Sequence, residues 1–146
     1  MALNSPEKAK IYTITLNLDM TKKIKKILNM LNDKGSLLDY GCGTGDFLLK
    51  AKNAGLSVAG IEPHQKAREA ATLKTSAKVF RSKESAETNP NKYDIITLWH
   101  SLEHVLDLEQ TIIFLKNKLN PEGKIVVAAP NHRSFDAKHY RDKWAA

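Results

Sequence analysis

The chain has 146 residues, of which 42% are hydrophobic and 27% are charged, and its formal net charge is +7. This length is enough for one domain with one hydrophobic core, and the composition is that of an ordinary globular protein. No apolar run approaches the roughly 20 residues that a membrane span needs, and the N-terminus has no signal-peptide apolar segment. A single cysteine excludes an intramolecular disulfide and a cysteine zinc site. We therefore expect one cytoplasmic domain over residues 1–146, with no metal site and no membrane partner.

The first predicted element is an amphipathic helix from about Asp19 to Leu31. Apolar residues recur there at helical spacing, at Ile24, Ile27, Leu28 and Leu31. Four lysines face away from this stripe, namely Lys22, Lys23, Lys25 and Lys26. We interpret them as a solvated helix face rather than a nucleic-acid surface, because the other lysines are spread along the chain instead of gathered with aromatic residues. Residues 1–34 are assigned to an N-terminal helical cap.

A glycine-rich turn follows the first predicted strand, Ser36–Tyr40, and precedes a helix from about Asp46 to Asn53. Glycines stand at alternate positions, at Gly41, Gly43 and Gly45, and keep Cβ atoms out of a bend where the backbone must pass close to something. Asp39 places a carboxylate at the end of the strand, and the first N–H groups of the helix point back at the turn. Cys42 lies inside the turn, where small size explains its presence better than reactivity does.

The spacing of this turn differs from that of phosphate-binding motifs. A dinucleotide site has the spacing G-x-G-x-x-G, whereas Asp46 occupies the place of the last glycine here. A carboxylate at the helix N-terminus disfavours a pyrophosphate, and with it an NAD-linked oxidoreductase. No Gly-Lys-Ser/Thr follows to make a P-loop. The residues fit a ligand with an ammonium group and little negative charge.

An acidic residue follows the second predicted strand, Ser57–Ile61. Glu62 lies about twenty residues beyond the glycine turn, where nucleoside-binding α/β folds place the acid that receives both ribose hydroxyls. The alternative is an acid favoured by the dipole of the next helix. Pro63 suits the first turn of that helix, which continues through Ala67–Leu73.

Three further strands are predicted, at Lys78–Phe80, from Tyr93 to the exit at His100, and at Lys124–Ala129. A polar loop, Ser82–Ser85, follows the first of them, and Asn120–Gly123 is typical of a turn. Asp107 with Gln110 predicts the capped start of a helix. Its buried stripe is predicted at Leu108, Ile112, Leu115 and Leu119. Strands that alternate with helices indicate right-handed crossovers and a parallel sheet, which is an α/β fold.

Four segments resemble, in order, those of the class I S-adenosylmethionine-dependent methyltransferases: Leu38–Gly45, Glu62, Tyr93–Val105 and Leu119–Asn131. The first matches the family's acidic residue followed by G-x-G-x-G, and the last two look like the small-molecule subgroup that includes the ubiquinone-biosynthesis O-methyltransferases. The resemblance implies a Rossmann-like doubly wound parallel sheet of about five strands, in the order 3-2-1-4-5, with helices on both faces and a cofactor-binding core over residues 35–131. It also implies methyl transfer from S-adenosylmethionine to a small-molecule acceptor, with S-adenosylhomocysteine as the product.

The same resemblance assigns residues to the cofactor. Those of the glycine turn, at the methionine end, are Asp39, Gly41, Cys42, Gly43 and Gly45. Glu62 and Pro63 are assigned to the ribose. The residues assigned to the edge of the adenine are Lys83 and Glu84, and the residues assigned to the methionine part are Trp99 and His100. Core packing is the alternative role for Trp99, and a surface loop is the alternative for Lys83 and Glu84. The candidate catalytic bases for an acidic acceptor such as a phenol are His100 and His104, although His104 is equally suited to brace its loop.

Members of this family continue beyond the fifth strand with two more strands, which are missing here, and residues 132–146 are assigned to a tail. We therefore expect a C-terminally truncated domain whose fifth strand is an exposed edge with unpaired backbone groups. We would then expect one of three consequences: a homodimer through that edge, a tail that covers the edge, or reduced stability of the fold. The same expectation raises an alternative function, a module that binds S-adenosylmethionine without turnover.

The net positive charge raises one more alternative, a nucleic-acid methylase. A base methylase that acts on an amino group usually shows Asn/Asp-Pro-Pro-aromatic after the fourth strand, and Trp99-His100-Ser101-Leu102 stand at that place here. We therefore expect a small-molecule acceptor and no nucleic-acid partner.

Overall fold

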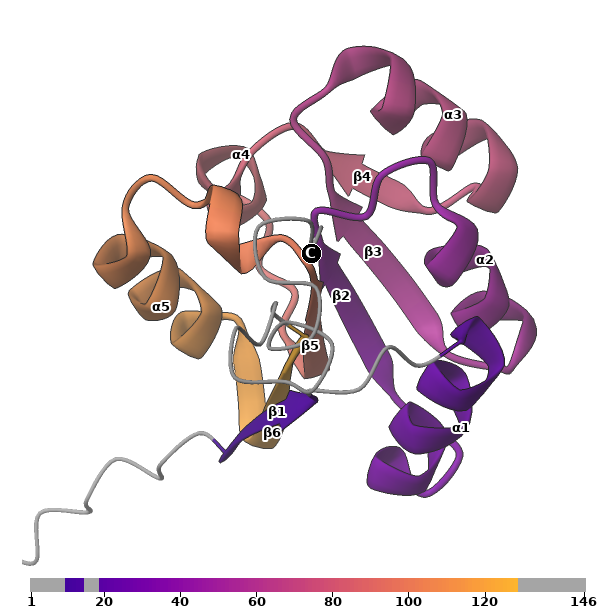
Figure 1. The fold of residues 1–146 in the computed structure, drawn as a ribbon. Helices are drawn as coiled ribbons and strands as arrows, with labels where there is room; N and C mark the ends of the chain where they lie inside the picture. Colours follow the sequence, from indigo (N-terminus) through magenta and orange to yellow (C-terminus); the bar gives the residue numbers. More distant parts are fainter. Residues whose placement is uncertain (1–9, 15–18, 129–146) are drawn as a thin grey trace, which may run out of the picture.

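The computed structural model describes residues 10–14 and 19–128, and the strands within them form one parallel sheet (Figure 1). From edge to edge the strand order is β1-β6-β5-β2-β3-β4. The strands are β1 (Lys10–Ile14), β2 (Ser36–Tyr40), β3 (Ser57–Ile61), β4 (Lys78–Phe80), β5 (Tyr93–Trp99) and β6 (Leu119–Ala128). Every neighbouring pair runs parallel, as the alternation of strands and helices predicts.

Helices cover both faces of this sheet (Figure 1). One side carries α1 (Met20–Leu31), α2 (Asp46–Asn53) and α3 (Gln65–Thr75), and the other carries α4 (Lys83–Glu87) and α5 (Leu108–Asn117). A short 3-10 helix, η1 (Leu102–His104), connects β5 to α5. The five strands predicted from the sequence occur as β4-β3-β2-β5-β6, so the predicted order 3-2-1-4-5 and the Rossmann-like doubly wound arrangement are confirmed.

Consecutive residues of the central strands divide between two hydrophobic cores. Leu37 of β2 and Ile95 of β5 pack in the core beneath α1 and α2, whereas Leu38 and Ile96 pack in the core beneath α5. All four side chains are fully buried, which is typical of parallel strands covered on both faces. The alternation also decides which polar side chains of these strands face which helices.

The strand β1 lies in the range 1–34, which therefore holds a strand as well as the predicted helix. β1 pairs in parallel with β6, from Lys10 opposite Lys124 to Ile14 opposite Ala128. The expectation that the fifth predicted strand forms an exposed edge is therefore wrong. Its cover comes from the N-terminal side of the chain, while the predicted tail, residues 132–146, lies outside the described residues. The reason for expecting a homodimer at this edge is removed with it.

Two predicted connections are parts of regular elements instead. The pairing of β5 with β6 steps from Tyr93–Leu119 to Ile95–Lys124, so the predicted turn Asn120–Gly123 is an irregularity inside β6. The polar loop predicted after β4 is the capped start of α4, because the Ser82 hydroxyl accepts a hydrogen bond from the Ser85 N–H at 3.2 Å. A short polar segment gives little indication of whether it forms a loop or joins a helix or strand, because its hydrophobic pattern is weak.

The helix α5 begins as predicted, because the Asp107 carboxylate accepts a hydrogen bond from the Gln110 N–H at 3.0 Å. The predicted buried stripe is wrong at its first position, since Leu108 is 49% exposed. The buried residues of the helix are Thr111, Phe114 and Leu115. The large Phe114 ring packs in this register against Tyr40 at the end of β2, with 6.4 Å between ring centroids.

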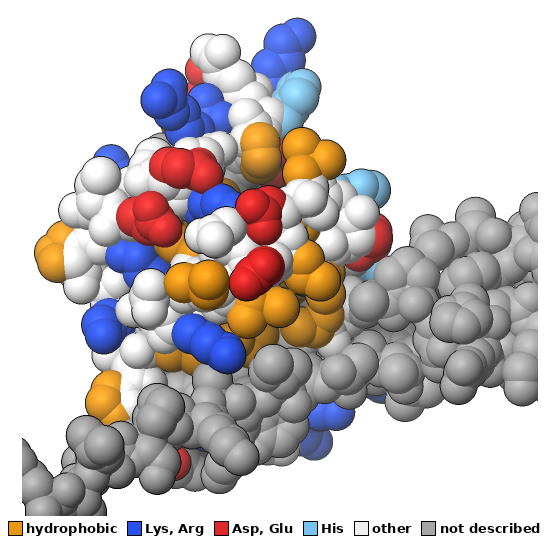
Figure 2. Space-filling view, turned by 90° about the vertical axis from the view of Figure 1, so that its left-hand side faces the viewer, with side chains coloured by type: hydrophobic (Ala, Val, Ile, Leu, Met, Phe, Trp, Pro, Cys, Tyr) orange, Lys and Arg blue, Asp and Glu red, His pale blue; other side chains and the backbone are white. Residues whose placement is uncertain are grey.

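The outer face of α4 and α5 mixes side chains of every type (Figure 2). Basic, acidic and hydrophobic side chains lie interspersed there, and Leu108 and Ile113 are among the exposed hydrophobic residues. In the described part of the chain, no helix has both the length and the apolar character needed to cross a membrane.

Candidate functional site

A cavity of about 460 Å³ lies at the carboxyl ends of β2, β3 and β5. This end of an open parallel sheet is where α/β proteins bind ligands, and the volume is in the range of small-molecule sites. The predicted ligand-binding residues that line it are Gly41, Glu62, Pro63, Lys83, Trp99, His100 and His104. The lining residues that the sequence did not assign to a ligand are Tyr40, Ser101, Val105, Leu106, Asp107 and Thr111. The cavity thus joins the glycine turn to the acid after the second predicted strand.

The glycine turn has the conformation that its residues predict. Gly41 has a φ of +80°, and a Cβ there would lie 2.8 Å from the Ser101 side chain, so a larger residue does not fit. The Ser101 hydroxyl donates to the Tyr40 carbonyl at 2.7 Å, which ties the exit of β5 to the end of β2. Gly45 lets α2 and α3 approach each other, because a Cβ on it would lie 2.9 Å from Ala71. Gly41 therefore forms part of the cavity wall, whereas Gly45 lies where α2 packs against α3.

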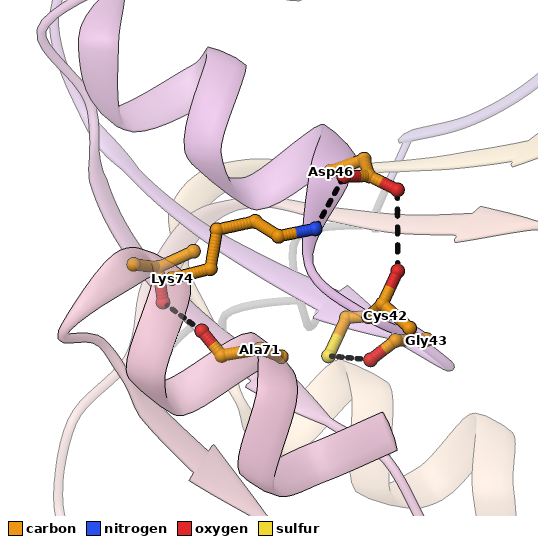
Figure 3. Close-up of polar contacts among 7 residues, drawn as sticks. Cys42, Gly43, Asp46, Ala71 and Lys74 are labelled. Carbon is orange, nitrogen blue, oxygen red and sulfur yellow. Dashed lines mark hydrogen bonds and ion pairs between the residues drawn. The ribbon is translucent and has the colours of Figure 1, made fainter. Parts of the chain in front are cut away.

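Cys42 is buried in the turn and does not line the cavity. Its Sγ lies 3.9 Å from the Gly43 carbonyl oxygen (Figure 3), and a Cβ on Gly60 of β3 would come within 2.6 Å of the same sulfur. Burial raises the pKa of the thiol to about 12, so the thiol is protonated at neutral pH. The position of Cys42 agrees with a packing role that depends on small size.

Asp46 occupies the first helical position of α2, as predicted, and has two partners there. Its carboxylate lies 2.5 Å from the Lys74 ammonium of α3 (Figure 3) and accepts a hydrogen bond from the Thr44 hydroxyl at 3.2 Å. The Lys74 contact holds the pKa of this carboxyl below its ordinary value. The helix N-terminus therefore carries a negative charge of its own, which disfavours a bound phosphate there.

Glu62 connects the end of β3 to the glycine turn. One carboxylate oxygen accepts the Gly43 N–H at 2.9 Å, and the other accepts the His64 N–H at 2.8 Å. The Arg68 guanidinium of α3 donates to the carbonyl oxygens of Glu62 and Pro63, at 3.0 and 2.9 Å. These bonds keep the Glu62 carboxylate at the cavity, on the opposite side of the turn from β5.

Asp39 is placed differently from the other predicted residues, because it is buried and does not line the cavity. It stands opposite Thr97 in the pairing of β2 with β5, and the Thr97 hydroxyl donates to its carboxyl at 2.7 Å. Burial raises the pKa of this carboxyl to about 7, against the opposing effects of the Thr97 hydrogen bond and the nearby Lys23 charge. Near neutral pH the group is therefore partly protonated.

Trp99 lines the cavity and also packs against the core beneath α1 and α2, so the predicted core packing is present and its contact with a cofactor stays a prediction. Its ring contacts Phe47 of α2 edge-on, with 5.2 Å between ring centroids. The Lys23 ammonium of α1 lies 4.7 Å from the centroid on the ring face, which is a cation–π contact. The indole Nε1 is buried and has no hydrogen-bond partner within the described residues. Lys23 is thus a residue near the site that the sequence assigned only to a solvated helix face.

The two candidate bases lie at the rim of the cavity and are exposed. His100 has a φ of +53°, which is uncommon for a residue other than glycine, and its N–H donates to the Ala128 carbonyl at 2.8 Å. His104 ends η1 and donates its N–H to the Ser101 carbonyl at 3.2 Å. Both residues line one cavity, and within residues 10–14 and 19–128 neither imidazole has a side-chain hydrogen bond that would separate a catalytic base from a structural role.

The residues predicted at the adenine edge divide between the cavity and the surface. Lys83 lines the cavity and its ammonium lies 3.3 Å from the Thr111 hydroxyl of α5, whereas Glu84 is exposed and does not line it. The sequence missed Tyr40 and Thr111 because their place at the cavity depends on how α4 and α5 pack on the sheet. The one available signal was the strand alternation, which places Tyr40 on the opposite face from Asp39.

Comparison with known proteins identifies the family. A family model described as a methyltransferase domain matches residues 12–146. An uncharacterized methyltransferase of Bacillus mycoides is 35% identical over 104 residues, which cover 64% of this chain and 46% of that protein. The ubiquinone biosynthesis O-methyltransferase of Saccharophagus degradans is 33% identical over 107 residues, which cover 65% of this chain and 43% of that protein. The chain thus spans less than half the length of these curated relatives.

A solved structure has the same fold. The SAM-dependent methyltransferase of Geobacter sulfurreducens, crystallised with S-adenosyl-L-homocysteine, matches with a TM-score of 0.57 and 21% identity, over 73% of this chain and 47% of that chain. The resemblance drawn from the glycine turn, Glu62 and the segments around β5 and β6 is therefore confirmed. This chain belongs to the methyltransferase domain family.

Proposed function

We propose that this chain binds S-adenosylmethionine in the cavity and transfers its methyl group to a small-molecule acceptor, with S-adenosylhomocysteine as the product. The observation that carries the proposal is that Gly41 and Glu62 line one cavity, with the Gly43 N–H bonded to the Glu62 carboxylate. The family match supports it, and so does the likeness to a methyltransferase solved with S-adenosyl-L-homocysteine.

The polar groups around the turn suit an adenosyl sulfonium better than a nucleotide. Each Glu62 carboxylate oxygen accepts one backbone N–H and retains a lone pair for a ribose hydroxyl. The carboxyl groups of Asp39 and Glu62 favour a cation, and Asp46 at the start of α2 disfavours phosphate. A Cβ built on Gly43 would meet nothing within 4 Å, which leaves open space beside the turn.

The chain contributes alignment and exclusion of water to the proposed reaction. Bound S-adenosylmethionine would supply a methyl group that its own sulfonium already activates, so the residues need mainly to orient the reactants. Glu62 would hold the ribose, and the Ser101 bond to the Tyr40 carbonyl keeps the wall beside Gly41 in place. His100 or His104 would accept the proton of an acidic acceptor such as a phenol.

The first test is cofactor binding by Glu62→Ala. We expect the affinity for S-adenosylhomocysteine to fall by about 10- to 100-fold, because charge-assisted hydrogen bonds to the ribose are lost. Isothermal titration calorimetry measures the affinity, and thermal unfolding without ligand reports whether the variant is folded. Glu84→Ala is the matched control, since Glu84 is exposed outside the cavity and its loss should leave the affinity unchanged. Equal affinities of Glu62→Ala and the wild-type chain would contradict the ribose role.

Turnover separates the two remaining functions. Methyl transfer from labelled S-adenosylmethionine to any member of a panel of phenols, amines and carboxylates would support the enzyme. Tight binding of S-adenosylhomocysteine without turnover on the whole panel would favour the alternative, a module that binds the cofactor only.

A further inference from the structure

One hydrophobic side chain that lines the cavity is fully exposed, namely that of Leu106. Its place in the chain is fixed on both sides, because η1 ends at His104 and the Asp107 carboxylate caps the start of α5. Val105, which also lines the cavity, donates its N–H to the Leu102 carbonyl at 3.2 Å. The fold therefore holds at the rim of the cavity an apolar side chain that the core does not use.

The position of Leu106 at the cavity distinguishes it from other exposed leucines. A single exposed leucine is common on protein surfaces, and Leu73 of α3 is an example that lies outside the cavity. Leu106 lines the cavity, and Leu108, two residues further along the chain, is 49% exposed. Apolar groups of a ligand that left water beside Leu106 would gain free energy from their burial.

The segment that carries Leu106 also carries a candidate base for the proposed reaction. His104 lies two residues before Leu106, and both residues line the cavity. Gly41 and Glu62, which the proposed function assigns to the cofactor, come instead from the ends of β2 and β3. An acceptor whose nucleophile is within reach of His104 therefore has Leu106 close by for the rest of its body.

The charged side chains near Leu106 in the chain are acidic, although the net charge of the whole chain is positive. No lysine or arginine occurs between Lys92 and Lys116. The exposed carboxylates of the segment around Leu106 are those of Glu103, Asp107 and Glu109. Carboxylates at the rim disfavour an anionic ligand, and they equally disfavour the anionic surface of a membrane.

We propose that Leu106, together with Val105, binds the apolar body of the methyl acceptor, and that this acceptor is uncharged or cationic rather than anionic. The proposal rests on the proposed function and makes Leu106 a specificity-determining residue of the same site. The Lys83 ammonium also lies at the cavity, but it contacts the buried Thr111 hydroxyl, whereas the three carboxylates are exposed on the segment that carries Leu106.

The first test varies the length of an apolar tail on a constant head group. NMR titration measures the affinities of butylamine and octylamine for the chain saturated with S-adenosylhomocysteine. We expect octylamine to bind about 10-fold more tightly or better, because each buried methylene contributes roughly a factor of four. In Leu106→Ser this ratio should fall by about threefold or more, whereas Leu106→Met should keep it. Leu73→Ser is the matched control, since Leu73 is 87% exposed and lies outside the cavity.

The second test reverses the charge of the head group at low ionic strength. Nonanoate carries the same eight-carbon tail as octylamine, with a carboxylate in place of the ammonium group. We expect octylamine to bind about threefold more tightly or better than nonanoate, and Asp107→Asn to reduce this preference. Asparagine also caps helices, so this variant keeps the start of α5 and should keep the ratio between octylamine and butylamine.

The outcomes separate this proposal from the proposed function. If the wild-type chain does not bind S-adenosylhomocysteine, the proposed function fails, and the acceptor role of Leu106 fails with it. If S-adenosylhomocysteine binds but tail length has no effect, or Leu106→Ser and Leu73→Ser behave alike, only the role of Leu106 is wrong. Tighter binding of nonanoate than of octylamine would overturn the charge preference and assign the choice of acceptor charge to Lys83.

Discussion

At the scale of single residues, the buried carboxyl of Asp39 is the group whose charge state matters most. It is 2% exposed and has one hydrogen-bond donor, the Thr97 hydroxyl, among the described residues. Burial is the largest influence and raises its pKa to about 7, while Glu62 adds to this effect and Lys23 opposes it. The charge beside the glycine turn therefore changes within the physiological pH range.

We predict that Asp39→Asn removes a pH dependence of stability. The folded pKa lies above the ordinary value of 3.8, so between about pH 4 and pH 7 the folded state holds a proton that the unfolded state has lost. The wild-type free energy of unfolding should accordingly fall, relative to that of the variant, as the pH rises from 5 to 8. Urea unfolding of both proteins at both pH values measures this difference. Parallel curves for the two proteins would show that Asp39 does not ionise in this range.

At the scale of elements, β1 decides how the sheet ends. The segment Lys10–Ile14 contains Ile, Tyr and Thr, which favour strands, and this was the signal available for predicting it. Its partner, Lys124–Ala128, lies more than a hundred residues further along the chain. By pairing with β6, β1 satisfies backbone groups that would otherwise form an open edge.

We predict unequal effects of proline at two adjacent positions of β1, Tyr12→Pro and Thr13→Pro. In a parallel pair, alternate residues of a strand direct their N–H groups at the partner, so one of these two changes removes a ladder hydrogen bond and the other serves as its control. The damaging variant should unfold at lower urea concentration. In the damaging variant, the backbone amides of Lys124–Ala128 should exchange with deuterium faster than the same amides do in the control variant. Equal and unchanged exchange in both variants would contradict the pairing of β1 with β6.

At the scale of the whole molecule, several lysines contribute to packing rather than to a basic surface. Their ammonium groups donate to carbonyl oxygens of other elements: Lys52 to Thr75, Lys118 to Asn89 and Lys124 to Met30. The outer face of α4 and α5 also interleaves acidic with basic side chains (Figure 2). The net charge of +7 is therefore not by itself the mark of a nucleic-acid surface.

We predict that Lys118→Met destabilises the fold and that Lys116→Met does not. Lys118 is 7% exposed, burial lowers the pKa of its ammonium, and its loss leaves the Asn89 carbonyl without this partner. The expected cost is about 1–3 kcal/mol of unfolding free energy. Lys116 lies exposed in the last turn of α5, which Lys118 caps, so its change removes one charge and no buried bond. Urea unfolding of the two variants compares them at equal net charge, and equal stabilities would contradict a structural role for Lys118.

The sequence by itself determined the features that depend on neighbouring residues. The apolar spacing of Ile24 and Ile27 marked the buried face of α1, and alternate glycines marked the turn after β2. The distance along the chain from that turn to Glu62 matched one strand–helix–strand unit, which is why the sequence predicts that Gly41 and Glu62 share one cavity, as they do. These inferences succeed because helix period, turn conformation and crossover length are local properties of the chain.

Only the tertiary structure decided which distant residues meet. It paired β1 with β6, turned α5 so that Thr111 and Phe114 are buried, and placed Lys23 over Trp99. It also buried Asp39 beside Thr97 instead of exposing it to the cavity. No local pattern encodes these contacts, because each depends on the packing of elements far apart in sequence against the two faces and edges of one sheet. The charge of the proposed site is therefore set by the fold and not by the motif alone.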